Sequence, residues 1–189
     1  MSQRLRTRIA PTPSGLLHPG NGLSFIMTWA IARAAGGEIL LRIDDLDRAR
    51  CREDYVADIF ETLEWLGIDY DEGPFGVEDF FSNWSQQSRF ELYEGALRQL
   101  KEQGHLFACR CSRKEIREAS ADGRYPGSCI GRSLDFDASG NAWRVRAPLE
   151  GQRVLMNRWQ HPAKAYSLEV LDDFVVRRKN KAPAYQIAS

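Results

Sequence analysis

The sequence lacks an excess of charge of either sign, because its 189 residues include 26 basic and 26 acidic side chains. No overall positive charge therefore indicates nucleic-acid binding, and local clusters must be examined instead. A run of about 18 apolar residues, which a membrane-spanning helix requires, does not occur, nor does the apolar core of a signal peptide at the N-terminus. The four cysteines fit a reducing cytosol and a metal better than a disulfide framework. These absences predict a soluble cytoplasmic α/β protein with one core and room for a small appendage.

The most informative stretch of the sequence comprises residues 7–47. After an apolar start comes the loop APTPSGLLHPGNG, whose prolines lack amide donors and whose glycines allow close approach of the backbone to a ligand. Residues 23–32 predict a largely buried helix that ends at Gly36-Gly37. Residues 38–43 predict a short strand followed by acids at 44, 45 and 47. Such a β-loop-α-β unit binds ligands at the strand ends, where the helix amides face an anion.

The rest of the chain predicts further helices and strands. Apolar residues at helical spacing predict helices at 52–65 and 88–103, and the turn-rich stretch 68–85 between them predicts a loop or a short irregular crossing. Alternation predicts a strand at 143–147 and two more at 174–178 and 184–188, joined by a turn at 179–182. The region from about 109 to 175, with its cysteines, basic residues and turns, looks like an insertion between the two halves of a nucleotide-binding sheet.

The loop sequence RIAPTPSGLLHPGN closely resembles the signature of class I glutamyl-tRNA synthetases and their shorter relatives, the glutamyl-queuosine tRNA(Asp) synthetases. His18-x-Gly20-Asn21 occupies the place of the family's HIGH sequence, and LLRIDDLDRAR that of its strand and acid-rich turn. The resemblance extends almost from end to end and includes DDFVVRRKNKAPAYQIAS. It implies an α/β, Rossmann-like class I aminoacyl-tRNA synthetase catalytic domain with an inserted small zinc-binding subdomain. Its implied parts are a first half at 1–108, an inserted acceptor-binding-like subdomain at 109–171 and the start of a second half at 172–189.

The same resemblance implies a site for ATP with Mg²⁺ and a site for L-glutamate. The implied catalytic and ATP-binding residues are His18, Gly20 and Asn21, where Asn21 replaces the second histidine of HIGH and can still donate a hydrogen bond. An arginine suits a substrate carboxylate and an acid its ammonium, and the implied glutamate-binding residues are Arg8, Ala10, Thr12, Ser14, Asp44 and Tyr185. As alternatives, His18 caps a turn, Arg8 and Asp44 form a surface ion pair worth under about 1 kcal/mol, and Tyr185 packs in the core.

Three cysteines and a tyrosine form a third pattern, Cys109-x-Cys111 followed by Tyr125-x-x-x-Cys129. Zinc takes four ligands in a tetrahedron, and the cysteines supply three. In the glutamyl-queuosine relatives the tyrosine of this pattern is a ligand, so the resemblance implies structural Zn²⁺ held by all four residues. The alternatives are free thiols, or His105 or water as the fourth ligand.

Basic side chains form three clusters that could together bind tRNA phosphates. Their members are Arg48, Arg50 and Arg52; Arg110, Arg113, Lys114 and Arg117; and Arg177, Arg178, Lys179 and Lys181. Any one cluster is more commonly a solvated face. Trp143 and Trp159 could stack on bases, but burial in the core is the more common fate of such residues.

The resemblance as a whole implies a monomeric ligase that activates L-glutamate as an adenylate with ATP and transfers it to tRNA. The tyrosine-containing metal pattern favours the queuosine of tRNA(Asp) as acceptor. The alternatives are the catalytic part of a conventional synthetase charging tRNA(Glu), and a non-catalytic tRNA- or nucleotide-binding module. A small-molecule adenylyltransferase would account for neither Arg8 and Asp44 nor the cysteines. The family's second signature, the lysine-bearing KMSKS loop, does not occur in residues 1–189, which predicts a chain truncated before that half of the catalytic domain.

Overall fold

A computed structural model describes residues 5–146, 153–158, 161–167 and 172–188. The chain divides into two compact units, Met1–Phe90 and Glu91–Ser189. The predicted parts 1–108, 109–171 and 172–189 were defined by resemblance to the family and not by compactness, and they stay a prediction. No helix in the described ranges combines the length and the apolar character that crossing a membrane requires.

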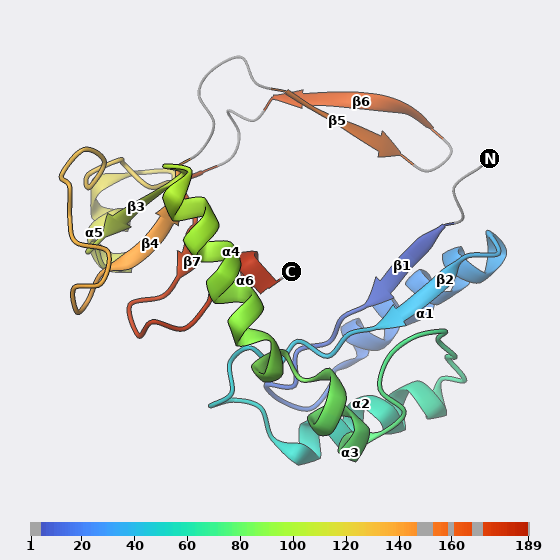
Figure 1. The fold of residues 1–189 in the computed structure, drawn as a ribbon. Coiled ribbons are helices and arrows are strands. Elements are labelled where there is room, and N and C mark those ends of the chain that lie inside the picture. Colours follow the sequence, from blue (N-terminus) through green and yellow to red (C-terminus); the bar gives the residue numbers. More distant parts are fainter. Residues whose placement is uncertain (1–4, 147–152, 159–160, 168–171, 189) are drawn as a thin grey trace. The chain divides into compact units, whose positions relative to one another are not determined.

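The first unit is built on a β-α-β motif, in which strands β1 (Arg6–Ile9) and β2 (Glu38–Leu41) are parallel and joined through helix α1 (Pro19–Ala34) (Figure 1). The register places Ile9 opposite Leu41. Parallel neighbouring strands need such a crossover connection, because a tight turn can join only antiparallel strands. The motif confirms the β-loop-α-β arrangement predicted for residues 7–47.

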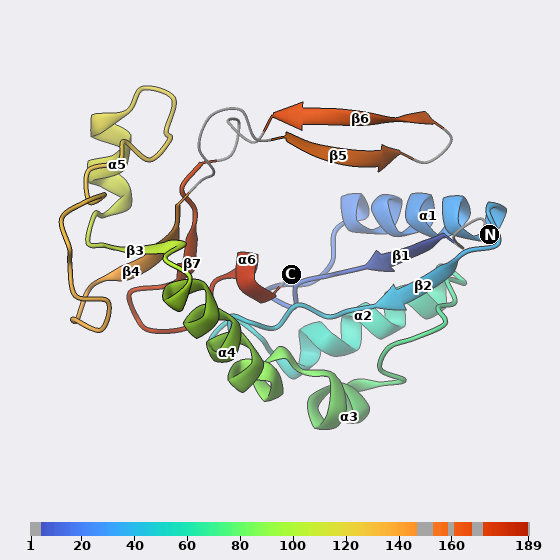
Figure 2. The same ribbon diagram turned by 45° about the horizontal axis from the view of Figure 1, so that its top comes forward.

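The core of the first unit lies on both faces of these strands. Figure 2 shows α1 on one face and α2 (Glu53–Trp65) on the other. Ile9, Ile39 and Leu41 of the strands are at most 2% exposed. From α2, the fully buried Val56, Ile59 and Leu63 recur at helical spacing on one face. This burial confirms the helix predicted at 52–65.

The predicted loop at 68–85 contains short helical segments before the next long helix. Two lie within this stretch, α3 (Val77–Asp79) and a π-helical turn (Phe80–Trp84). A 3₁₀ turn (Gln86–Arg89) follows the stretch and leads into α4 (Phe90–Glu102). Phe80 is fully buried in the core of the first unit. The burial of Phe80 is a tertiary contact that the turn residues of this stretch do not indicate.

The second unit contains an antiparallel sheet in the order β3-β4-β7, formed by β3 (Leu106–Cys109), β4 (Ala142–Val145) and β7 (Val175–Arg177). Its other elements are α5 (Arg113–Ala119), the hairpin of β5 (Arg153–Arg158) and β6 (His161–Ser167), and α6 (Tyr185–Ala188). Leu97 of α4 packs with Leu106, Trp143 and Val176 of the three strands. Trp143 is therefore a core residue, whereas Trp159 lies outside the described residues.

Two sequence-based expectations about these elements are wrong. The first helix begins at Pro19 rather than at residue 23 and is not largely buried, since Leu23 is 62% and Met27 55% exposed. A helix that is apolar all round can press only one side against two strands, and here that side is Phe25 and Ala32. The second is the strand at 184–188, which forms the helical turn α6 and brings Ile187 against the core of the second unit.

Candidate functional site

The loop before α1 is fixed by His18, which caps the helix. Its imidazole Nδ1 accepts a hydrogen bond from the Gly20 amide at 3.1 Å, and the Asn21 Oδ1 accepts one from the His18 amide at 3.0 Å. This reciprocal capping satisfies amides that a helix start otherwise leaves unpaired. The Leu17 amide also donates to Asp58 Oδ2 on α2 at 2.7 Å. His18 therefore has the capping role that we considered as an alternative.

A cavity of about 530 Å³ lies beside this loop, within the size range of small-molecule sites. The predicted glutamate-binding residues and the predicted ATP-binding residues both contribute to its lining, which includes Arg8, Ala10, Thr12, Ser14, His18 and Asn21. The N-terminus of the 16-residue α1 carries the positive end of the helix dipole toward this region. The cavity can therefore take an anionic group at the helix and a second one at the guanidinium of Arg8.

Asp44 does not line this cavity; it is buried, and its amide donates to the carbonyl of Pro11, which does line it. Its carboxylate is 4% exposed and pairs with Arg42, whose Nε lies 2.7 Å from Oδ1 and whose Nη2 lies 3.1 Å from Oδ2. Burial raises the pKa of Asp44, while the Arg42 hydrogen bonds and the nearby Arg8 charge act to lower it. The ion pair at Asp44 is thus made with Arg42 and is buried, unlike the surface pair with Arg8 that we considered as an alternative.

Arg42 and Gln86 are the residues at this acid that sequence reasoning missed. Gln86 is 1% exposed and donates from Nε2 to Asp44 Oδ1 at 3.0 Å. Arg42 could have been found, because residues two apart in an extended segment share a face. Gln86 lies more than 40 positions along the chain, and no spacing rule connects it with Asp44.

The remaining predicted contact of the amino-acid site, Tyr185, belongs to the second unit. It begins α6 and is 51% exposed, so the alternative of a buried core aromatic is wrong. Its role at the glutamate site stays a prediction.

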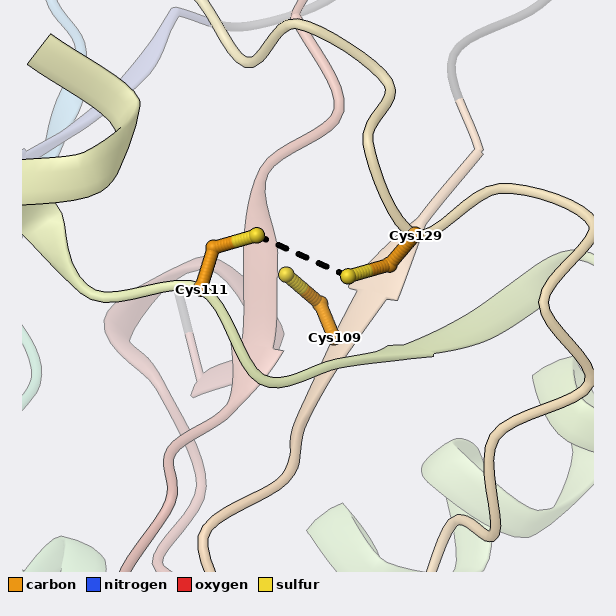
Figure 3. A group of neighbouring side chains, drawn as sticks. All are labelled: Cys109, Cys111 and Cys129. Carbon is orange, nitrogen blue, oxygen red and sulfur yellow. Dashed lines mark hydrogen bonds between the residues drawn. The ribbon is translucent and has the colours of Figure 1, made fainter. Parts of the chain in front are cut away.

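The cysteine cluster of the second unit has the dimensions of a zinc site. The sulfurs of Cys109, Cys111 and Cys129 all lie within 4.8 Å of one another, and those of Cys111 and Cys129 are 3.5 Å apart (Figure 3). Thiolates on a tetrahedral zinc, at bond lengths of about 2.3 Å, stand about 3.8 Å apart. The three side chains therefore need only small shifts to bind one ion. His105 is exposed and is not a member of the group formed by the described side chains.

Tyr125 places its hydroxyl beside the same sulfurs. The oxygen lies 3.3 Å from Cys109 Sγ and accepts the Cys129 amide at 2.8 Å. The pKa of Cys129 is lowered to about 7: burial, the largest influence, acts to raise it and is outweighed by hydrogen bonds from Tyr125, the Arg110 backbone and the neighbouring thiols. Burial raises the pKa of Cys111 to about 11. This donor set fits a zinc ion, because metal binding supplies the positive charge that holds such thiols deprotonated.

Contacts around the ring hold Tyr125 in this position. Its backbone amide donates to both oxygens of Asp172, at 3.1 and 3.0 Å, and the guanidinium carbon of Arg144 lies 4.2 Å from the ring centroid. The Phe107 ring packs at 5.7 Å. These residues, too, carried no recognisable signal in the sequence.

Two of the three basic clusters adjoin each other in the second unit, since Lys179 Nζ donates to the Arg110 carbonyl at 2.6 Å. Arg177 is already engaged: it pairs with Glu94 and Asp137 and stacks over Trp143. The cluster of Arg48, Arg50 and Arg52 belongs to the first unit.

A parallel β-α-β unit with a histidine-glycine loop bordering a cavity is the arrangement that the resemblance to class I aminoacyl-tRNA synthetases implied. Residues 4–189 match the family model described as tRNA synthetases class I (E and Q), catalytic domain, and the chain belongs to this family. The resemblance stated from the loop sequence is thereby confirmed.

Curated relatives include two kinds of enzyme. A glutamyl-Q tRNA(Asp) synthetase of Cupriavidus metallidurans is 41% identical over 199 residues, which cover 100% of this chain and 60% of that protein. A glutamate–tRNA ligase of Nitratidesulfovibrio vulgaris is 36% identical, over 96% of this chain and 38% of that protein. The chain thus spans less than two thirds of the length of these relatives.

Solved structures support the fold. A glutamate tRNA ligase from Elizabethkingia meningosepticum superposes with a TM-score of 0.72 over 98% of this chain and 41% of that one. A glutamate-tRNA synthetase from Elizabethkingia anophelis gives 0.73. Both are 24% identical to this chain, so they bear on architecture alone.

Proposed function

We propose that this chain forms the glutamate- and ATP-binding part of an enzyme that activates L-glutamate as glutamyl-adenylate and transfers it to tRNA. The observation that carries the proposal is the cavity shared by Arg8 of β1 and by His18 and Asn21 of the α1 start. Activation joins the glutamate α-carboxylate to the α-phosphate of ATP and releases pyrophosphate. A protein catalyses such a step mainly by positioning and by stabilising charge.

The amino-acid end of the cavity is assigned to Arg8 and its neighbours. The planar guanidinium of Arg8 binds one substrate carboxylate through two parallel hydrogen bonds. The backbone of Ala10–Thr12 and the Ser14 hydroxyl complete the polar lining. Asp44 balances the substrate ammonium from behind this wall, and Tyr185 borders the amino acid in the assembled enzyme.

The nucleotide end is assigned to the start of α1. The histidine cap holds the Gly20 amide and the Asn21 side chain in place, and the helix dipole favours the phosphates of ATP. Because Oδ1 of Asn21 is occupied by the cap, its NH₂ group is the part left to donate to ATP. Mg²⁺ accompanies the ATP and neutralises part of its charge.

The favoured acceptor is queuosine of tRNA(Asp). The Cys109, Cys111, Tyr125 and Cys129 group matches the pattern of the glutamyl-queuosine relatives, and the relative from Cupriavidus metallidurans bears that name. A second candidate is the charging of tRNA(Glu), which the similarity to glutamate–tRNA ligases favours. In either case the adjoining basic clusters of the second unit supply cations for tRNA phosphates.

The same four residues hold structural Zn²⁺. An ion bound there would link β3 to the turns that follow it and so fix a segment with few buried residues of its own. The four side chains would complete the tetrahedral coordination of the ion, so no open coordination position would remain for chemistry. Its role in the proposal is stability of the subdomain and not activation.

The proposal is tested by incubating the protein with ATP, radiolabelled glutamate and tRNA, and by measuring pyrophosphate exchange alongside label transfer. Transfer that depends on queuosine in tRNA(Asp) supports the favoured acceptor, and transfer to tRNA(Glu) the second. Nucleotide binding without exchange and without transfer to any tRNA would overturn both in favour of a non-catalytic binding module.

A further inference from the structure

We propose that Gln86 is a positioning residue that holds the Asp44 carboxylate ready for the ammonium group of the amino acid. This inference rests on the proposed glutamate site and adds a specificity determinant to it. Gln86 does not line the cavity, so it acts through Asp44 rather than by touching the substrate.

The hydrogen bonds at Asp44 are distributed unevenly between its two oxygens. Oδ1 accepts from Arg42 Nε at 2.7 Å and from Gln86 Nε2 at 3.0 Å, whereas Oδ2 accepts from Arg42 Nη2 at 3.1 Å. A carboxylate oxygen has two lone pairs. Within the described part of the chain, Oδ1 is therefore saturated and Oδ2 keeps capacity for one more donor. Gln86 fixes which of the two oxygens that is.

The Gln86 side chain can do this because its backbone is itself fixed to the neighbouring acid. Asp45, 1% exposed, accepts the Gln86 amide at Oδ1 over 2.7 Å and the Ser85 hydroxyl at Oδ2 over 2.5 Å. The Gln87 Nε2 donates to the Asp45 carbonyl at 2.7 Å. The two successive acids that follow β2 thus bind the N-cap of the 3₁₀ turn and its first two residues. Asp45 contacts Ser85, Gln86 and Gln87, and Asp44 contacts Gln86.

The other end of the Gln86 amide shows that packing alone does not explain this residue. Its Oε1 is buried and has no hydrogen-bond partner among the described residues, which is an unfavourable state for an amide oxygen. Turning the amide around would aim this oxygen at a carboxylate. An apolar side chain of equal length would fill the same space without an unpaired atom. The bond to Asp44 is what the glutamine provides.

Asp44 is connected to the cavity through the backbone. Its amide donates to the Pro11 carbonyl at 2.8 Å, and Pro11 lines the cavity between Ala10 and Thr12. The backbone of Asp44 is therefore fixed to the segment that lines the amino-acid end of the site.

The test compares two ligands, glutamate and glutarate, which differ only by the ammonium group. Calorimetric titration of the wild-type protein should give tighter binding of glutamate. Gln86→Met should lower glutamate affinity about tenfold and leave glutarate affinity unchanged. Gln87→Met, which alters the adjacent glutamine bound to Asp45 and not to Asp44, is the matched control and should keep the wild-type preference.

A second measurement needs no variant and decides the matter if Gln86→Met does not fold. In nuclear magnetic resonance spectra of the wild-type protein, glutamate should shift the Gln86 side-chain amide resonance and glutarate should not. Equal shifts with both ligands, or equal losses of both affinities in Gln86→Met, would show a merely structural role and overturn the inference alone. A wild-type protein that binds no glutamate would overturn the proposed site and this inference with it.

Discussion

The Asn21 side-chain oxygen accepts the His18 backbone amide at 3.0 Å, while the His18 ring accepts the Gly20 amide. Asparagine in the place of the family's second histidine therefore has a definite structural use, as the return half of a capping box. The histidine ring and the helix start are consequently one rigid unit at the edge of the cavity. Changes at either residue alter both helix stability and the shape of the proposed nucleotide site.

These two effects can be separated at His18. His18→Ala removes cap and imidazole, and we expect a loss of stability of about 1 kcal/mol with pyrophosphate exchange about a hundredfold slower. His18→Asn keeps a good capping residue and removes only the imidazole, so stability should stay near wild type while exchange remains slow. Thermal unfolding and exchange assays measure the two. Wild-type exchange in His18→Asn would remove the imidazole from the mechanism.

Gly20 is the position where one added methyl group should disturb the His18 cap. A Cβ there would lie 2.9 Å from His18 Cε1, so Gly20→Ala should displace the ring and weaken ATP binding by about tenfold, the cost of one misplaced hydrogen bond to a charged group. Gly22→Ala in the same helix is the matched control, because its Cβ meets only Leu66 Cδ1 at an ordinary 3.7 Å. Equal ATP affinities of the two variants, measured by calorimetry, would contradict the expectation.

The metal site should respond to single-atom changes. Cys109→Ser and Tyr125→Phe each remove one donor, and Tyr125→Phe keeps the ring that contacts Phe107 and Arg144. We expect zinc content after dialysis against a chelator to fall well below one ion per chain in both variants, and the second unit to become easier to cleave by protease.

Cys51→Ser is the control for this experiment, since Cys51 belongs to the first unit and is no member of the sulfur cluster. It should retain zinc as the wild type does. Unchanged zinc in Tyr125→Phe would limit the ligands to the three cysteines and water, and unchanged zinc in Cys109→Ser would remove the site.

Sequence reasoning was sufficient for elements whose signal is local and failed where tertiary packing decides. The β-loop-α-β unit has proline, glycine and apolar periodicity in one continuous stretch, and its elements are present in the predicted order, although the helix begins earlier, at Pro19. Residues 184–188 alternate like a strand but form a helical turn, in which Ile187 packs against the core of the second unit. The burial of Asp44 by Arg42 and Gln86 depends on a contact 42 residues away, and the exposure of Leu23 depends on how little sheet faces α1.

Asp69 should make the stability of the folded protein depend on pH in the acidic range. Hydrogen bonds from the Trp29 indole at 2.6 Å and from Arg33 lower the pKa of Asp69. An acid whose pKa is lower in the folded state stabilises that state above its unfolded pKa of about 3.9 and loses this contribution as pH falls through the folded value. Asp69→Asn should therefore unfold at a lower temperature than wild type at pH 6 but not at pH 2. The difference should be small, because the carboxylate is 69% exposed.

The exposed Glu61 of α2 provides a matched change of charge, and Glu61→Gln should show no such convergence. A gap between wild type and Asp69→Asn that is constant from pH 6 to pH 2 would assign the effect to packing rather than to the ionised group.

Arg144 provides a last test, of whether a buried cation supports the tyrosine that completes the metal site. It is 9% exposed, lies over the Tyr125 ring and donates from Nη1 to the Asp173 carbonyl. Arg144→Met keeps most of the apolar stem but removes the cation, so we expect a loss of stability of about 1–3 kcal/mol in the protein freed of zinc. Arg146→Met changes an exposed arginine just after the same strand and should cost little.

If Arg144 acts by fixing Tyr125, Arg144→Met should weaken zinc binding in the wild-type background and have no further effect in Tyr125→Phe. Equal weakening in both backgrounds would mean that Arg144 stabilises the sheet and not the tyrosine.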